Sequence, residues 1–106
     1  MTMLTPPTDC NSMPALRAEI DTLDRDLVAL LAKRAGYIDR AIQLKQVNGW
    51  PARIPSRVED VVTKVRQAAD GQGLDPNLAE TLWRQLIDWS ITREAQVIGD
   101  TKDRAE

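Results

Sequence analysis

Between residues 16 and 46 the chain contains no proline and a single glycine, Gly36. Apolar residues recur there in alternating steps of four and three, which is the spacing of a coiled-coil seam. The residues at these positions are Leu16, Ile20, Leu23, Leu27, Leu30, Tyr37, Ala41 and Leu44. Such a helix spans about 46 Å, whereas a domain of 106 residues has a radius of gyration of about 13 Å. Because the seam extends beyond any core that one chain can form, we expect an intertwined homodimer.

Two cations interrupt the apolar rows of this predicted helix. Arg34 occupies a seam position, and Lys45 lies eleven residues later on a parallel row that also contains Arg34. Eleven residues return a helix to within roughly 20° of its starting direction and advance it by about 16 Å. One interpretation is that both side chains snorkel to water; we favour a site for a small anion between them. Arg17 lies about 25 Å from Arg34 along the helix, so it reaches that anion only from an antiparallel helix of a second subunit.

The composition restricts the chemistry. The chain has no histidine, which excludes histidine triads and histidine metal ligands, and it has no nucleophile elbow or phosphate-binding loop. Its net charge of −2 gives no basic footprint for nucleic acid or an anionic membrane. The single cysteine, Cys10, leaves no internal disulfide, and neither a signal peptide nor a membrane-spanning run is recognisable. We expect a cytoplasmic protein without metal or cofactor that works with arginine, lysine and carboxylates.

Local signals divide the chain into an all-α domain with two terminal segments. We expect a flexible segment at 1–11, a helical domain at 12–98 made of one very long and two shorter helices, and a disordered tail at 99–106. The boundary signals are Ser12 as an N-cap, a break at Asn48-Gly49-Trp50-Pro51, a capping box from Ser56 to Glu59, helix-ending Gly71 and Gly73, and an Asp75-Pro76 start.

The third predicted helix carries two polar residues, Ser90 and Glu94, one turn apart in an otherwise apolar row. They are either simply exposed near the helix end or part of the anion site. Two arginines would suit two carboxylates, while a lysine and a protonated carboxyl group would donate toward a developing oxyanion. This set fits a pericyclic rearrangement of a small dicarboxylate, which needs no nucleophile.

Three motifs carry a resemblance to a known family. They are Leu16-Arg17-x-x-Ile20-Asp21-x-x-Asp24-x-x-Leu27-Val28-x-Leu30-Leu31-x-x-Arg34, then Lys45, then Gln85-Leu86-Ile87-x-x-Ser90-x-x-x-Glu94. Over about residues 12–98 the chain resembles the all-helical chorismate mutase family, and within it the small isochorismate-pyruvate lyase branch. The resemblance implies a homodimer with shared sites and a role in aromatic amino acid or salicylate biosynthesis.

The resemblance also implies roles for individual residues. Arg17 of the neighbouring subunit and Arg34 would bind the substrate carboxylates. Lys45 would contact a carboxylate and the ether oxygen of the breaking bond. Arg57, at the start of the second helix, and Ser90 would line the site.

Two departures from the family pattern bear on the reaction. Glu94 falls where many members have glutamine, and it must be protonated to donate to the ether oxygen. Many mutases hold the ring hydroxyl with acidic residues where this chain has Ile54 and Val58. We favour a chorismate mutase with Lys45, Glu94 and Arg34 as catalytic residues, because lyase members of this fold can also show mutase activity. The alternatives are an isochorismate-pyruvate lyase and a non-catalytic helical dimerisation module.

Overall fold

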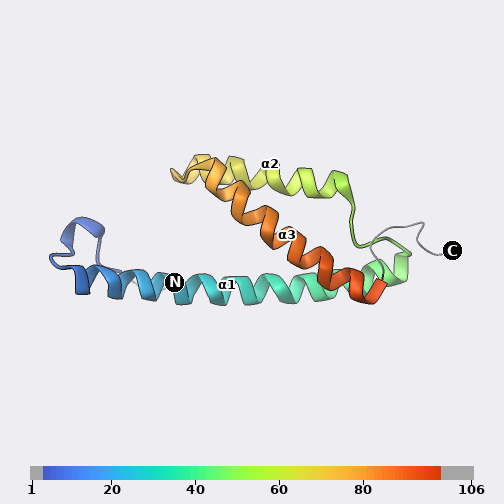
Figure 1. The fold of residues 1–106 in the computed structure, drawn as a ribbon, viewed down its shortest axis with the longest axis horizontal. Coiled ribbons are helices and arrows are strands. Elements are labelled where there is room, and N and C mark those ends of the chain that lie inside the picture. The colour runs from blue at the N-terminus through green and yellow to red at the C-terminus, as the bar shows by residue number, and fades with distance from the viewer. Residues whose placement is uncertain (1–3, 99–106) are drawn as a thin grey trace. The chain divides into compact units, whose positions relative to one another are not determined.

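A computed structural model describes residues 4–98 of the chain, and these residues are helical over most of their length (Figure 1). The elements are the 3-10 helix η1 (Pro7–Asp9) and the α-helices α1 (Met13–Asn48), α2 (Pro55–Gln72) and α3 (Pro76–Ile98). No strand occurs within these residues, so the all-α prediction of one very long and two shorter helices is confirmed. The tail predicted at 99–106 lies outside the described residues.

The chain divides into two compact units, Met1–Tyr37 and Ile38–Glu106. The first unit contains η1 and the larger part of α1. The second unit contains the end of α1 together with α2 and α3. The candidate residues of the site are therefore distributed over both units.

The first unit begins α1 with a side-chain cap, as the sequence predicts. The backbone N–H of Ala15 donates to Ser12 Oγ at 3.2 Å, which satisfies one of the free donors of the first turn. The preceding segment folds back, because the N–H of Thr5 donates to Glu19 Oε2 at 2.7 Å. The flexibility expected for residues 1–11 stays a prediction.

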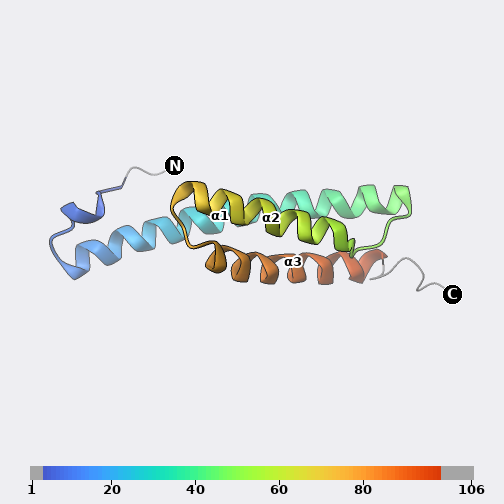
Figure 2. The same cartoon turned by 90° about the horizontal axis from the view of Figure 1, so that it is seen from above.

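In the second unit, α2 and α3 run in opposite directions and pack against each other (Figures 1 and 2). Their buried cluster consists of Ala52, Val62, Ile87 and Ile91, with Val58, Val61, Ala95 and Ile98 packed around it. This cluster draws on the loop before α2 and on α2 and α3, but not on α1. The one residue of α1 that is buried is Ile42.

The turn between α2 and α3 follows its sequence signals. Gly73 adopts a left-handed conformation with φ of 77°, and its N–H reaches the carbonyl oxygens of Ala69 and Asp70, a common way to end a helix. Asp75 then caps α3, because its Oδ1 accepts a hydrogen bond of 2.9 Å from the N–H of Asn77. Gly73 therefore ends α2 as predicted, whereas Gly71 lies inside the helix; the predicted start of α3 is confirmed.

The capping box predicted at the start of α2 is wrong. The helix begins at Pro55, Ile54 is its N-cap, and no side chain caps it. Proline suits the first helical position because its ring presets φ and it has no N–H to satisfy. Ser56 is therefore already inside the helix, and Glu59 turns to Arg84 of α3 instead of capping.

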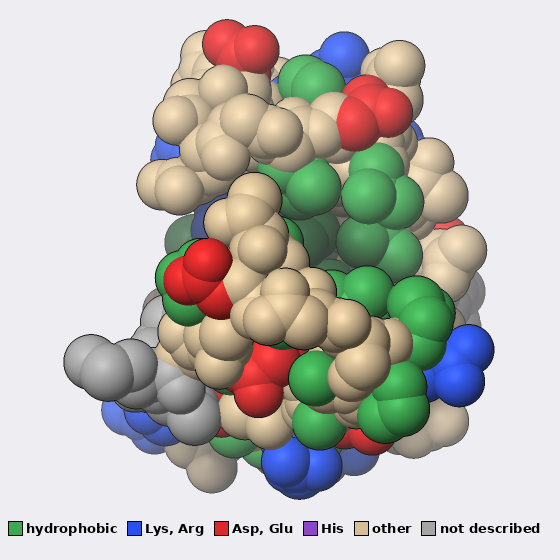
Figure 3. Space-filling view, turned by 90° about the vertical axis from the view of Figure 1, so that its left-hand side faces the viewer, with side chains coloured by type: hydrophobic (Ala, Val, Ile, Leu, Met, Phe, Trp, Pro, Cys, Tyr) green, Lys and Arg blue, Asp and Glu red, His purple; other side chains and the backbone are tan. Residues whose placement is uncertain are grey.

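Many large hydrophobic side chains are exposed, and Figure 3 shows several at the surface of one face. On α1 these include the seam residues Ile20, Leu23, Leu27, Leu30, Tyr37 and Leu44, and on α3 they include Leu78, Leu82, Trp89 and Val97. The buried residues of α3 are instead Ala79, Ile87, Ser90, Ile91 and Glu94. No helix in residues 4–98 has the length and apolar character needed to cross a membrane.

Candidate active site

The last turn of α1 and the C-terminal part of α3 are joined by a buried ion pair. Lys45 Nζ lies 2.5 Å from Glu94 Oε1, and the two side chains are only 17% and 5% exposed. Both simpler interpretations are therefore wrong: Lys45 does not snorkel to water, and Glu94 is not on an exposed helix end. The helical periodicity predicts that both side chains point toward the interior of the fold, and the structure confirms this direction.

A backbone carbonyl of the loop is the second partner of the lysine. Lys45 Nζ donates to the carbonyl oxygen of Ala52 at 2.8 Å, and Ala52 itself is buried. The loop returns to α1 because the N–H of Trp50 donates to the carbonyl oxygen of Lys45 at 2.9 Å, while Gly49 takes a φ of 70°. An ammonium group has three N–H donors, so one remains for a ligand after the two hydrogen bonds of the described structure.

Ser90 lies one turn before Glu94 and is equally buried. Its hydroxyl donates to the carbonyl oxygen of Leu86 at 2.9 Å, which is a common arrangement for serine within a helix. Among residues 4–98, every buried side-chain nitrogen or oxygen has a hydrogen-bond partner. The polar groups of this region are thus held in place before any ligand arrives.

The charges of the pair determine what it can do. A carboxylate only accepts hydrogen bonds, whereas a protonated carboxyl group also donates one. The pair can therefore offer a small anion the ammonium of Lys45 and, in the protonated form of Glu94, a second hydrogen-bond donor.

A second ion pair joins α1 and α3 near the first. Arg93 Nε donates to Asp39 Oδ1 at 2.6 Å, and a second guanidinium nitrogen donates to Oδ2 at 3.2 Å. The hydrogen bond from Arg93 lowers the pKa of Asp39 below its ordinary value. The Arg93 guanidinium also lies over the Trp89 ring, 5.6 Å from its centroid, in the range of a cation–π contact.

The sequence analysis missed this second pair, although a signal existed. Neither Asp39 nor Arg93 has an oppositely charged residue three or four positions away on its own helix, which is where helical ion pairs form. Their partners therefore had to come from another element. The carbonyl of Ala52 left no signal at all, because every residue offers one.

The other predicted site residues are placed separately. Arg57 lies in the first turn of α2 with its side chain 63% exposed, and it pairs with Asp60 at 2.6 Å. It makes no described hydrogen bond to Lys45 or Glu94. Arg17 and Arg34 belong to the first unit, so their approach to Lys45 stays a prediction.

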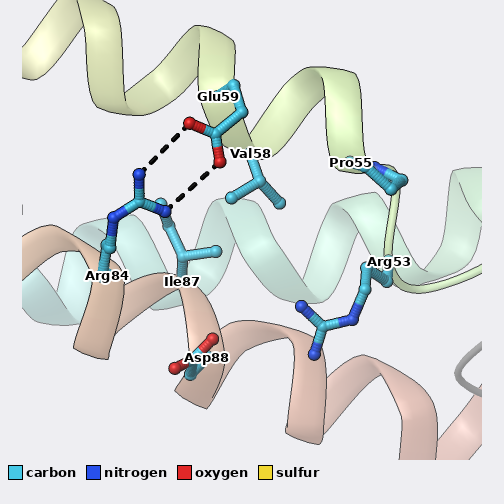
Figure 4. Close-up of a pocket in the computed structure, with 7 residues that line it drawn as sticks. All are labelled: Arg53, Pro55, Val58, Glu59, Arg84, Ile87 and Asp88. Atoms are coloured by element: carbon cyan, nitrogen blue, oxygen red, sulfur yellow. Dashed lines mark hydrogen bonds and ion pairs between the residues drawn. The ribbon is translucent and has the colours of Figure 1, made fainter.

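A pocket of about 280 Å³ lies between α2 and α3, and Figure 4 shows its lining. Its residues are Arg53, Pro55, Val58, Glu59, Arg84, Ile87 and Asp88. Neither Lys45 nor Glu94 lines it. The side chains of Glu59 and Arg84 in this pocket are 66% and 43% exposed, so it lacks the burial of the Lys45–Glu94 pair.

An exposed ion network borders this pocket. Arg84 binds Glu59 through two nitrogens, at 3.1 and 3.3 Å, and its Nε donates to Glu80 at 2.8 Å. Arg66 of α2 donates to the other oxygen of Glu80 at 2.9 Å. The hydrogen bond from Arg84 lowers the pKa of Glu80, and the bond to Glu59 contributes most to the raised pKa of Arg84.

The fold and the pair define an all-helical protein with a buried lysine and glutamate facing each other. The chorismate mutase type II family matches residues 16–105 of the sequence. The chain belongs to this family, as the sequence motifs predicted. Its place in chorismate metabolism follows from that membership.

Three proteins are similar to this chain over most of its length. Isochorismate pyruvate lyase of Pseudomonas aeruginosa is 31% identical over 100 residues, which are 93% of this chain and 97% of the relative. The T-protein of Enterobacter agglomerans is 33% identical over 82 residues, which are 77% of this chain but only 22% of that protein. The 4-amino-4-deoxychorismate mutase of Streptomyces venezuelae is 31% identical over 80 residues, covering 76% of this chain and 78% of the relative.

Proposed function

We propose that this protein is a chorismate mutase that rearranges chorismate to prephenate by charge stabilisation, without a covalent intermediate. The observation that carries the proposal is the buried contact of Lys45 with Glu94 in a chain of the chorismate mutase type II family. A pericyclic step requires the substrate to be confined in one conformation and the charge of the breaking bond to be stabilised. A preorganised donor of this kind contributes about 3–4 kcal/mol to transition-state stabilisation.

The residues divide the work between binding and charge stabilisation. Arg34 and Arg17 of a second subunit bind the two substrate carboxylates, for which the guanidinium fork is suited. Lys45 uses its remaining N–H toward the ether oxygen, and Glu94 donates to the same oxygen in its protonated form. Ser90 and Arg57 complete the lining.

The assembly we propose is a homodimer with two shared sites. The exposed apolar seam of α1 supports it, because contiguous apolar surface of this kind marks an interaction site. Arg17 supports it as well, since it lies too far along α1 to serve the same site as Arg34 and Lys45. Chains carrying Arg17→Ala and chains carrying Arg34→Ala should each be inactive, and should regain one intact site per heterodimer when they are mixed and allowed to exchange subunits. If the mixture remains inactive although mass spectrometry finds heterodimers, the sites are not shared.

A second candidate is isochorismate-pyruvate lyase activity, which would yield salicylate and pyruvate. The lyase of Pseudomonas aeruginosa matches nearly its whole length to this chain. In addition, this chain has Ile54 and Val58 at the positions where many mutases hold the ring hydroxyl with acidic residues. The non-catalytic dimerisation module remains the candidate outside enzymes.

The decisive experiment offers chorismate and isochorismate separately and identifies the products. Prephenate from chorismate supports the mutase, and salicylate with pyruvate from isochorismate supports the lyase. A ligand that binds the native state must also raise the melting temperature. If neither compound is converted and neither raises the melting temperature, the dimerisation module replaces both enzymes as the best interpretation.

A further inference from the structure

In the second unit, charged side chains link α1 to α3. The buried cluster that holds α2 to α3 contains no residue of α1, and the one buried residue of α1 is Ile42. Among the described residues, two ion pairs cross from α1 to α3, the buried Lys45–Glu94 pair and the exposed Asp39–Arg93 pair. The carboxylate of Glu94 can meet the ammonium of Lys45 only while the two helices keep their positions along each other.

The second pair is suited to keep them there. Arg93 directly precedes Glu94 in the chain, so displacement of one residue displaces the other. Its guanidinium binds both oxygens of Asp39, and such a planar, two-point contact fixes orientation as well as distance. The ring of Trp89, one turn earlier on α3, also contacts the guanidinium through a cation–π interaction.

We propose that Asp39 and Arg93 form a positioning pair, which sets Glu94 of α3 against Lys45 of α1. The consequence for catalysis rests on the proposed function, whereas the consequence for the Lys45–Glu94 contact does not. Asp39 and Arg93 touch no substrate in this proposal, and they act only through the geometry of the buried pair.

The exposure of the pair suits a positioning role better than a stabilising one. Both side chains are nearly half exposed, at 46% and 47%, and exposed ion pairs contribute little to folding. The lowered pKa of Asp39 keeps its carboxylate ionised above the ordinary aspartate range. The pair therefore persists from pH 5 to 9, where the chemistry of Glu94 would be measured.

The first test observes the buried contact directly by NMR of the Lys45 ammonium group. This group is hydrogen-bonded to Glu94 and Ala52, so its protons should exchange slowly and give a visible signal. Asp39→Asn and Arg93→Met should each broaden or abolish that signal. The double variant should be no worse than either single variant, because both remove the same contact.

Glu59→Gln is the matched control for this experiment. It breaks the exposed ion pair between Glu59 of α2 and Arg84 of α3, in which the guanidinium also contacts both carboxylate oxygens (Figure 4). That pair joins α3 to α2, which the buried cluster already holds. The Lys45 signal should stay unchanged in Glu59→Gln.

The second test measures kcat and KM separately, which distinguishes position from charge. Asp39→Asn removes a negative charge and Arg93→Met removes a positive one. A direct charge effect on the reacting substrate would therefore move kcat of the two variants in opposite directions. Misplacement of Glu94 should instead lower kcat in both variants.

The size of the effect should follow from misplacement of a donor. We expect kcat to fall about ten- to a hundredfold with little change in KM, and this loss should shrink when Glu94 is already alanine. An unchanged Lys45 signal in both variants, or kcat changes of opposite sign, would overturn the positioning role. If the parent protein converts neither chorismate nor isochorismate, the proposed function fails, while the NMR test still decides the positioning role by itself.

Discussion

The two ends of α3 use the same kinds of charged residue in opposite surroundings. Near its start, Glu80 and Arg84 pair across to α2 with their side chains 30% and 43% exposed. Near its end, Glu94 meets Lys45 with its side chain only 5% exposed. Pairing therefore does not distinguish the two regions, but burial does. From the charged pairs alone, either end of α3 would be an equally good candidate for the functional site.

The physical cost differs accordingly. Exposed ion pairs contribute little, because water screens them and long side chains lose freedom when they are held. A buried pair instead gives up the hydration of both ions, and replacing such pairs by apolar residues is often neutral or stabilising. Lys45 and Glu94 are thus poorly explained as a stabilising device, which supports a chemical role.

The largest contrast should come from Lys45→Met. Removing one partner of a buried ion pair leaves the other uncompensated, at a cost of about 3–5 kcal/mol. Activity should fall by roughly 10²–10³ as a transition-state donor is lost. Stability should fall as well, because Glu94 keeps its buried position without a counter-charge. Thermal denaturation between pH 5 and 9, together with kcat/KM on chorismate, measures both effects.

Lys33→Met is the matched control, because Lys33 is an exposed lysine of the same helix. It should leave activity unchanged and add no pH dependence to stability. If Lys33→Met lost as much activity as Lys45→Met, the burial of Lys45 would not explain its importance.

Glu94→Gln should have a smaller and more selective effect. Glutamine keeps the shape of the side chain and donates a hydrogen bond at any pH, whereas glutamate donates only when protonated. The parent should lose activity as pH rises, and the variant should retain activity without this alkaline decline. The comparison requires kcat/KM of both proteins on chorismate from pH 5 to 9. Parallel profiles, or an inactive variant, would mean that Glu94 acts as an anion or does not touch the ether oxygen.

The stability that the exposed network contributes should be lost at acidic pH. The pKa of Glu80 is lowered by Arg84, so Glu80 stabilises the fold above the ordinary glutamate pKa, and this contribution is lost as pH falls through the lowered value. Glu80→Gln should therefore reduce stability slightly at pH 7 and by less at pH 3. Urea denaturation at both values checks this, and an equal effect at both would contradict the assignment.

The smallest effect is expected for Arg84→Met. It removes two exposed contacts while its aliphatic stem is kept over the α2–α3 packing. Activity should not change, and the melting temperature should fall only slightly. A pronounced loss of activity would give the network, and the pocket beside it in Figure 4, a role that burial does not indicate.

Short-range patterns predicted the helices and the inward direction of Lys45 and Glu94, because helical periodicity alone sets which way a side chain points. They failed at the start of α2, where Pro55 outweighed the cap expected from Ser56. The Asp39–Arg93 contact joins residues 54 positions apart, and no local pattern reports a contact between different helices. The approach of Arg17 to the site follows from helix length only if the chain forms a dimer, and both remain predictions.

The hydrogen bond from Lys45 to the carbonyl oxygen of Ala52 determines which changes the connecting loop can tolerate. A carbonyl belongs to the backbone, so no substitution of a side chain removes it. A change of loop length would remove it, since one residue more or less between α1 and α2 moves a different carbonyl opposite the ammonium. Substitutions in this loop that respect the buried position of Ala52 and the left-handed conformation of Gly49 should therefore keep the hydrogen bond, whereas insertions and deletions should remove it.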